Sequence, residues 1–226
     1  MITLKHYNWE HTIKFNDGSI THLFIESPIT YRNYVSELLL QINGEEGDFI
    51  LSDTEELSIP KKLAILTDPI NLQFDEKKIN SKINKDLLSI ASNSQALERT
   101  SFSLISLLEQ YASEIAEDYG YNIDYETPDI SSILKLLSFH ITTEYESLAD
   151  KILEWMNITH DILKIDNFIL LNLQTYFTEK EIDQLCIEAS SSKHNLLLID
   201  QFNTYKKHNV ITIDSDNCEL FNEPIL

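Results

Sequence analysis

The chain has few cysteines and no long apolar run, and each shortage argues against a class of protein. Its two cysteines, Cys186 and Cys218, lie far apart, which argues against a zinc knuckle, a paired redox motif and a disulfide framework. No apolar run approaches the roughly 18 residues of a membrane-spanning helix. The first residues, MITLKHYNWEH, lack the apolar block of a signal peptide. We therefore expect reduced thiols and a cytoplasmic protein with no membrane partner.

Glycine is also scarce, and this argues against the phosphate-binding loop of nucleotide hydrolases. That loop, GxxxxGK[ST], wraps phosphates with backbone amides. The four glycines are followed by Ser, Glu, Asp and Tyr, so none of them opens such a loop. After the early strand, where the loop belongs, the sequence reads ESPITYR. ATP hydrolysis by the usual route is therefore not expected.

Signatures of catalysis by side chains are missing as well. None of the seven histidines falls into an HxxxH or HExxH spacing, and no serine lies in a GxSxG turn. We expect the histidines to be surface or packing residues. Carboxylate pairs could still hydrolyse phosphodiesters with two metal ions.

Basic residues are outnumbered, and the net charge of -20 opposes binding to nucleic acid unless the charges are segregated along the chain. Residues 60–85 carry six lysines against three acids, whereas residues 86–150 carry only Arg99 and Lys135 against twelve acids. This distribution permits a basic face on an acidic molecule. It is equally typical of solvated helix faces.

The N-terminal part of the chain shows turn and helix signals. Apolar residues flank Asn16-Asp17-Gly18, whose residues tolerate the positive φ of tight turns, and this predicts a β-hairpin. Ser27 and Pro28 predict the N-cap and the first position of a helix that runs to about Gln41.

Short apolar runs predict an α/β fold with a mostly parallel sheet, because strands that are apolar on both faces need helices on both sides. The runs are FIL at 49–51, LAILT at 63–67, FILLNL at 168–173, NLLLID at 195–200 and VITID at 210–214. Asp68, Asp200 and Asp214 follow such strands, at the edge where open α/β sheets bind ligands. They are either ligands there or caps of the next turn.

Helical spacing dominates two other segments. Residues 76–119, broken only at Ser92-Asn93-Ser94, predict two antiparallel helices, and residues 144–162 predict a third. We therefore expect an α/β head and a helical leg. The head comprises residues 1–75, 120–143 and 163–226, and the leg comprises residues 76–119 and 144–162.

An acidic stretch, EDYGYNIDYETPD, spans residues 117–129. Aromatic and polar residues alternate from Tyr119 to Glu126, which predicts a half-buried strand, and Thr127-Pro128-Asp129 predicts a helix start. The spacing is not that of an EF-hand, although the oxygen ligands suit calcium. The stretch is either a divalent-cation site or a solvated surface with a helix-capping aspartate.

Residues 41–87 resemble a known family. INGEEGDFILS, and LTDPINL followed by a lysine-rich helix, are similar in order and spacing to the short form of the type II-A CRISPR-associated accessory protein, the Csn-type ring former required for spacer acquisition. The later order of elements through NLLLID agrees with this family along nearly the full chain.

The resemblance implies a head like a degenerate P-loop nucleotide-hydrolase core, a helical leg and a homotetramer that closes into a ring. It implies sequence-independent binding of double-stranded DNA ends during spacer acquisition, without enzymatic activity. It also implies Ca2+ ions that support the ring, and the CRISPR integrase complex and effector nuclease as partners.

Candidate site residues follow from this resemblance. The candidate DNA-binding residues are basic residues expected in the head: Arg32, Lys61, Lys62, Lys135, Lys206 and Lys207. The candidate calcium ligands are acids expected at the junctions between head and leg: Glu117, Asp118, Asp124, Glu126, Asp129 and Glu144. Two other functions stay open, namely a divergent nucleotide hydrolase or metal-dependent nuclease that uses Asp200, and an acidic scaffold that binds only proteins.

Overall fold

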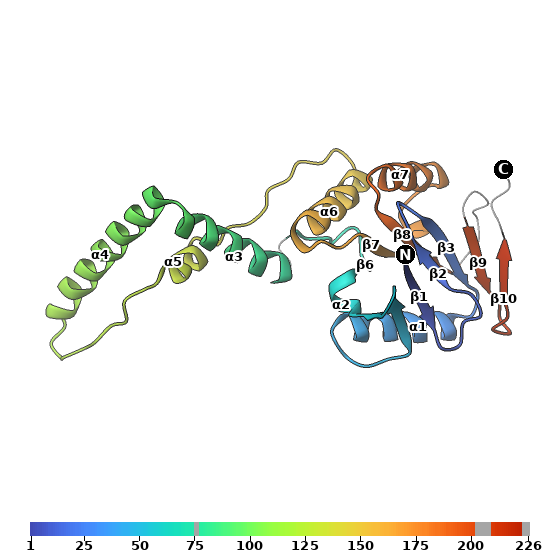
Figure 1. Cartoon of the computed structure of the whole chain (residues 1–226), viewed down its shortest axis with the longest axis horizontal. Helices are drawn as coiled ribbons and strands as arrows, with labels where there is room; N and C mark the ends of the chain where they lie inside the picture. The colour runs from blue at the N-terminus through green and yellow to red at the C-terminus, as the bar shows by residue number, and fades with distance from the viewer. Residues whose placement is uncertain (75–76, 202–208, 223–226) are drawn as a thin grey trace. The chain divides into compact units, whose positions relative to one another are not determined.

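The computed structural model describes residues 1–74, 77–201 and 209–222. The chain divides into two compact units (Figure 1). The sheet unit comprises Met1–Leu72 and Thr143–Leu226, and the helical unit comprises Gln73–Thr142.

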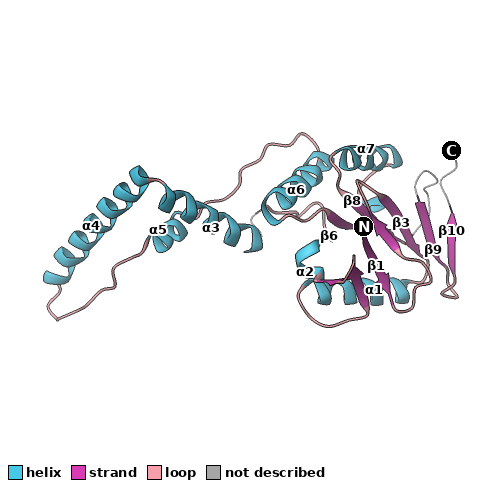
Figure 2. Ribbon diagram, in the orientation of Figure 1, coloured by secondary structure: helices cyan, strands magenta, loops and turns pink. Residues whose placement is uncertain are grey.

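Ten strands and five helical segments form the described part of the sheet unit (Figure 2). The strands are β1 (Ile2–His6), β2 (Ile13–Phe15), β3 (Ile20–Ile25), β4 (Phe49–Ser52), β5 (Glu56–Leu57), β6 (Leu63–Leu66), β7 (Asn167–Leu171), β8 (Asn195–Asp200), β9 (Asn209–Ile213) and β10 (Glu219–Asn222). The helical segments are α1 (Pro28–Ile42), α2 (Ile59–Lys62), α6 (Leu148–Leu163), the 3-10 helix η1 (Leu173–Thr175) and α7 (Glu179–Ser191).

The larger sheet has the strand order β10-β9-β3-β8-β7-β6. Its pairs are parallel except for β10 with β9, which confirms the predicted α/β fold with a mostly parallel sheet. Four of the five apolar runs form strands of this sheet. Every residue of β7 and β8 is buried, as expected for central strands that are covered on both faces.

The fifth apolar run belongs to a second, smaller sheet with the order β2-β1-β4-β5. Residues 49–51 lie in β4, which pairs with β1 in antiparallel orientation. The prediction of a buried parallel strand is therefore wrong for this run. Phe49 and Leu51 are buried but Ile50 is half exposed, because only one face of β4 is covered.

The predicted β-hairpin is also wrong, although its turn forms. Asp17 and Gly18 have φ values of 40° and 81°, in the left-handed region. However, β2 pairs with β1, and β3 pairs with β8 and β9, so the turn leads from one sheet to the other. The turn is held by Asn195, whose Oδ1 accepts hydrogen bonds from the backbone amides of Gly18 and Ser19, both at 3.0 Å.

Both sheets share one core with α1. The Ser27 side chain accepts a hydrogen bond from the Thr30 amide, and Pro28 is the first helical residue, as predicted. The helix contacts β3 and β6 of the larger sheet and β4 of the smaller one. Leu38 is fully buried among side chains from both sheets.

Helices α6 and α7 cover the opposite face of the larger sheet. Trp155 of α6 packs against Phe168 of β7, with ring centroids 5.4 Å apart. Phe168 alternates with Ile169, which faces the shared core, so the two side chains lie on opposite faces of the sheet. Leu185 of α7 is buried, and α7 contacts β8.

The division into units differs from the one expected from the sequence. The sequence predicts residues 144–162 in the leg and residues 120–143 in the head. Contacts instead place α6 in the sheet unit and residues 73–142 together in the helical unit. The spacing of Ile152, Trp155 and Met156 indicates a helix with an apolar face but does not say which element covers that face.

The helical unit contains α3 (Lys77–Asn93), α4 (Gln95–Glu117) and α5 (Ile130–Leu137). Ser94 caps α4 at the predicted break. The two long helices are not an antiparallel pair, because α4 buries no residue and diverges from α3 beyond the break (Figure 1). The short helix α5 also contacts α3. Within the described residues, no helix is long and apolar enough to cross a lipid bilayer.

Candidate functional site

The carboxyl edge of the larger sheet holds the three aspartates that the sequence singled out. Asp68 accepts hydrogen bonds from the amides of Ile70 (3.0 Å) and Asn71 (3.2 Å), and Asp214 accepts from the amides of Asp216 and Cys218. Bonds to Asn71 and Ile70 hold the pKa of Asp68 below its usual value. These two aspartates cap turns, which confirms the simpler of their two predicted roles.

Asp200 at the end of β8 is different, because it is only 3% exposed. Its Oδ1 accepts a hydrogen bond from the backbone amide of Gln174 at 3.4 Å. Burial raises the pKa of Asp200 to about 6. Burial, and then the Asp200 charge, also raise the pKa of Tyr31 to about 12, although a bond to Asn172 lowers it. A magnesium ligand must be ionised and reachable, and this carboxyl group has a reduced tendency to ionise.

We expect Asp200→Asn to stabilise the protein by about 1–2 kcal/mol near pH 8 and to have little effect near pH 4. Below the unfolded-state pKa both states hold the proton. As the pH rises toward about 6, the unfolded state loses the proton more readily. The native carboxylate is therefore penalised in full only above that value. Urea unfolding at several pH values measures the difference.

Asp214→Asn is the control for this change, because Asp214 follows β9 at the same edge of the larger sheet but caps an exposed turn. An asparagine side chain can accept the same two amide bonds. A gain near pH 8 that is equal in both variants would contradict the assignment to burial of Asp200.

The place of a phosphate-binding loop is occupied by a very short connection. Strand β3 ends at Ile25 and α1 begins at Pro28, so only Glu26 and Ser27 lie between them. The loop GxxxxGK[ST] needs several residues with free backbone amides around the phosphates, and proline has no amide hydrogen. This connection therefore cannot cradle a nucleotide phosphate as that loop does.

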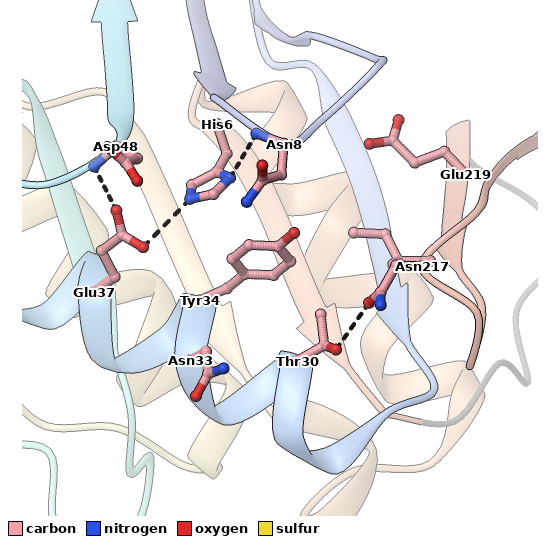
Figure 3. Close-up of a pocket in the computed structure, with 10 residues that line it drawn as sticks. His6, Asn8, Thr30, Asn33, Tyr34, Glu37, Asp48, Asn217 and Glu219 are labelled. Atoms are coloured by element: carbon pink, nitrogen blue, oxygen red, sulfur yellow. Dashed lines mark hydrogen bonds and ion pairs between the residues drawn. The ribbon is translucent and has the colours of Figure 1, made fainter.

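A polar pocket of about 520 Å³ lies beside α1 (Figure 3). It is lined by His6, which is 2% exposed and comes from β1. The Asn8 amide donates to His6 Nδ1 at 3.1 Å, so Nε2 carries the proton and points to Glu37 Oε2 at 3.3 Å (Figure 3). Glu37 also accepts a hydrogen bond from the backbone amide of Asp48.

Acidic groups dominate this pocket, which is lined by Glu37, Asp48 and Glu219. Phosphates would be repelled there, so the pocket suits neither a nucleotide nor the DNA backbone. No linear motif indicates this pocket, because His6, Glu37 and Asp48 come from β1, α1 and the loop before β4. His6 was predicted to be a surface or packing residue, and its contact with Phe49 (ring centroids 4.6 Å apart) confirms packing.

The structure does not gather the six predicted calcium ligands into one site. All six are exposed, and Glu144 lies in the sheet unit whereas the other five lie in the helical unit. Residues 119–126 form no strand, so the predicted alternation on a strand is wrong, and Tyr121 is 80% exposed.

Local hydrogen bonds explain how the acids are used instead. Asp129 accepts a hydrogen bond from the Ser132 amide at 2.7 Å, and bonds from the side chain and then the backbone of Ser132 hold the pKa of Asp129 below its usual value. In the described residues, two groups of three His, Cys, Asp or Glu side chains lie close enough to share an ion, and neither contains any of the six. The acids as placed do not supply the six to eight oxygens that calcium needs. Calcium at these residues stays a prediction from the resemblance.

Similarity to a known protein family assigns this chain to that family. A family model described as CRISPR-associated protein (Cas_Csn2) matches residues 41–217, which is most of the chain. This chain belongs to the Csn2 family. Membership supports a role in CRISPR adaptation and confirms the resemblance stated for residues 41–87. Csn2 proteins are CRISPR accessory proteins and are not known as enzymes.

Curated Csn2 relatives support the assignment along most of the chain. The CRISPR-associated protein Csn2 of Enterococcus faecalis is 23% identical over 189 residues, which cover 80% of this chain and 82% of that protein. The Csn2 protein of Streptococcus agalactiae is 21% identical over 195 residues, covering 83% and 85%. The crystal structure of Stu0660 of Streptococcus thermophilus matches with a TM-score of 0.58 at 11% identity, covers 99% of this chain and 76% of that one, and shows the shared fold.

The predicted DNA-binding residues of this Csn2 family member lie on several elements. Arg32 lies on α1, and Lys61 and Lys62 form the last turn of α2; all three are exposed. Lys135 is exposed on α5, in the helical unit rather than in the head as expected from the sequence. Lys206 and Lys207 lie outside the described residues.

Helix α3 carries a further basic surface. It has four lysines and one acid, Asp86, which pairs with Lys82 at 2.6 Å. Lys78, Lys82 and Lys85 recur at the spacing of one helix face, and all three are exposed. The segregation of charge that the sequence permits is therefore realised along this helix.

Proposed function

We propose that this chain binds the ends of double-stranded DNA without sequence preference, as a ring-shaped homotetramer, during CRISPR spacer acquisition. The observation that carries the proposal is membership of the Csn2 family over residues 41–217. The expected partners are the integrase complex and the effector nuclease of the same CRISPR system, which supply the chemistry.

Exposed basic residues support binding through phosphates. Lys61 and Lys62 form an adjacent pair on α2, and α3 carries the lysine row described above. Phosphate contacts carry no base information, so binding through them is independent of sequence and falls with salt as counterions are released. In a tetramer each patch occurs four times, so several basic patches can contact one duplex although every subunit keeps its acidic total.

An apolar face on α4 supports self-association. Leu104, Leu107 and Tyr111 recur at helical spacing and are 41%, 63% and 63% exposed. Large apolar side chains gathered on one surface are typical of an interface. In the proposed homotetramer, a second copy of the chain packs against this apolar face of α4.

The connection between β3 and α1 and the buried state of Asp200 support a non-enzymatic role. The connection between β3 and α1 is too short to contain a phosphate-binding loop. The carboxyl group of Asp200 at the end of β8 is buried away from solvent, and burial raises the pKa of Asp200 to about 6. Hydrolysis of ATP, or DNA cleavage that Asp200→Ala abolishes, would favour the enzymatic alternative.

A gel-shift experiment with two forms of one DNA tests the proposal. A closed ring can be threaded only by a free end, so we expect the protein to retain linear duplex and not a covalently closed circle of the same sequence. Linear duplex with streptavidin on both biotinylated ends should behave like the circle. Light scattering should give the mass of four chains.

Two outcomes would overturn the proposal. Equal retention of the circle and of the linear duplex would show that ends are not required. A monomeric mass under the binding conditions would exclude a ring.

A further inference from the structure

Two histidines and one aspartate meet at the edge of the larger sheet opposite Asp200. His160 lies in the last turn of α6, Asp166 precedes β7, and His194 precedes β8. One ligand atom from each side chain lies within 4.8 Å of the other two. The ring centroids of His160 and His194 are 5.7 Å apart.

His194 has one ring nitrogen in use and one free. The residue is 2% exposed, and its Nε2 lies 2.9 Å from Asn157 Oδ1. An amide oxygen only accepts, so Nε2 carries the proton and Nδ1 carries a lone pair. Nδ1 is buried and has no hydrogen-bond partner among the residues that the structure describes. A buried acceptor without a partner is destabilising, so a ligand for it would be favoured.

This arrangement is typical of a histidine that binds a metal. Such a histidine usually donates its second ring N–H to an oxygen, which fixes the tautomer and the orientation of the ring. Asn157 Oδ1 supplies that oxygen here. Nδ1, which carries a lone pair, is then the ring atom that remains available to bind an ion.

The other two members of the cluster connect it to solvent. The side chains of His160 and Asp166 are 43% and 51% exposed, and His160 Nδ1 contacts Asp166 Oδ1. An ion can therefore enter from the surface and retain a water ligand. Bonds of about 2.0–2.1 Å in a tetrahedral zinc site place ligand atoms about 3.3 Å apart. The ligand atoms here lie within 4.8 Å of one another, so the two exposed side chains would have to move closer to His194 around an ion.

We propose that His160, Asp166 and His194 bind one divalent transition-metal ion, with zinc as the preferred ion. Two imidazoles and one carboxylate suit zinc and its neighbours in the first transition row, whereas calcium and magnesium prefer oxygen ligands alone. Water completes the coordination on the exposed side. The ion joins the end of α6 to the starts of β7 and β8, and it stabilises the sheet unit because it binds the folded chain.

Titration of the full-length chain with Zn2+ after treatment with EDTA tests the site. We expect calorimetry to show one zinc per chain and a rise in the melting temperature. His160→Asn and Asp166→Asn should each weaken zinc binding about tenfold or more. Both side chains are substantially exposed, so circular dichroism should show an unchanged fold.

His140→Asn is the matched control, because His140 is an exposed histidine of the helical unit and lies outside the cluster. It should leave zinc affinity unchanged. Affinity that survives both ligand substitutions would overturn the proposal. Loss of binding in Asp48→Asn with retention in Asp166→Asn would also overturn it, because the ion would then lie at His6.

Co2+ provides an independent readout of the ligands. We expect the cobalt-loaded chain to show the visible absorption of a four-coordinate site without a thiolate band, since neither cysteine belongs to the cluster. A strong thiolate band would place the ion at a cysteine and contradict the assignment.

Discussion

Replacement of Lys61 and Lys62 by glutamate is expected to weaken binding of linear duplex DNA about 100-fold near physiological salt. Both side chains are exposed at the end of α2, and the double change reverses two charges in each subunit. Loss of one phosphate contact reduces the slope of the logarithm of the binding constant against the logarithm of the salt concentration by about one. We therefore expect a shallower salt dependence as well as a lower affinity, both measured by fluorescence anisotropy.

Lys180→Glu combined with Lys193→Glu is the matched control. These lysines are exposed in the same unit, on α7 and just after it, and the change in net charge is identical. We expect only the small loss that comes from a more negative protein. An equal loss in the two double variants would contradict a local role for Lys61 and Lys62.

The lysine row on α3 separates two versions of the DNA interface. If the head residues bind DNA, reversal of Lys78, Lys82 and Lys85 should cost less affinity than reversal of Lys61 and Lys62. A larger loss in the α3 variant would assign the principal contact to the helical unit.

Gly18→Ala is expected to destabilise the sheet unit by about 3–4 kcal/mol. Gly18 has a φ of 81°, which a side chain disfavours, and a Cβ there would lie 2.5 Å from the Ser190 carbonyl oxygen. The turn would have to move away from α7 and would lose the bonds from the Gly18 and Ser19 amides to Asn195. Urea unfolding monitored by circular dichroism measures this loss.

Gly44→Ala isolates the contribution of the backbone. Gly44 has a φ of 94°, but a Cβ there would meet no atom within 4 Å. We expect a cost of about 1 kcal/mol from the positive φ alone. Equal losses at both glycines would contradict the close approach of the turn to α7.

Much of the fold is predictable because its signals are local. Runs such as NLLLID are apolar at consecutive positions and as short as a strand, which favours a strand covered on both faces, and this one forms β8 with every residue buried. Ser27 caps α1 as predicted, and Ser94 caps α4 within the predicted break, because a hydroxyl group satisfies amides within its own turn.

Pairing between distant segments was not predictable in the same way. The turn at Asn16-Asp17-Gly18 has hairpin chemistry, but the carboxamide of Asn195, remote in sequence, holds it between two sheets. The alternation from Tyr119 to Glu126 satisfies the period of a strand, yet no partner strand pairs with it in the described structure. The periodicity of apolar residues indicates the secondary structure of a segment but does not indicate which other segment pairs with it.

The same limit applies to the sites. His160, Asp166 and His194 come from a helix end and two strand starts, so no linear spacing connects them. Asp200 was found in the sequence because it ends an apolar run, but its burial depends on neighbours such as Gln174 from another segment. Family resemblance supplied the proposed partner, and single residues at the DNA interface stay predictions.

The helical unit is an insertion: the chain leaves the sheet unit after Leu72 and returns at Thr143. For the stability of the sheet unit, the inserted residues count as one long loop whose two ends are held together. The entropic cost of closing such a loop grows only logarithmically with the length of the loop. Doubling the loop costs about 0.6 kcal/mol. Evolution can therefore lengthen, shorten or reshape this excursion while the parallel sheet keeps its stability, so the reach of the insertion can be tuned separately from the scaffold that carries it.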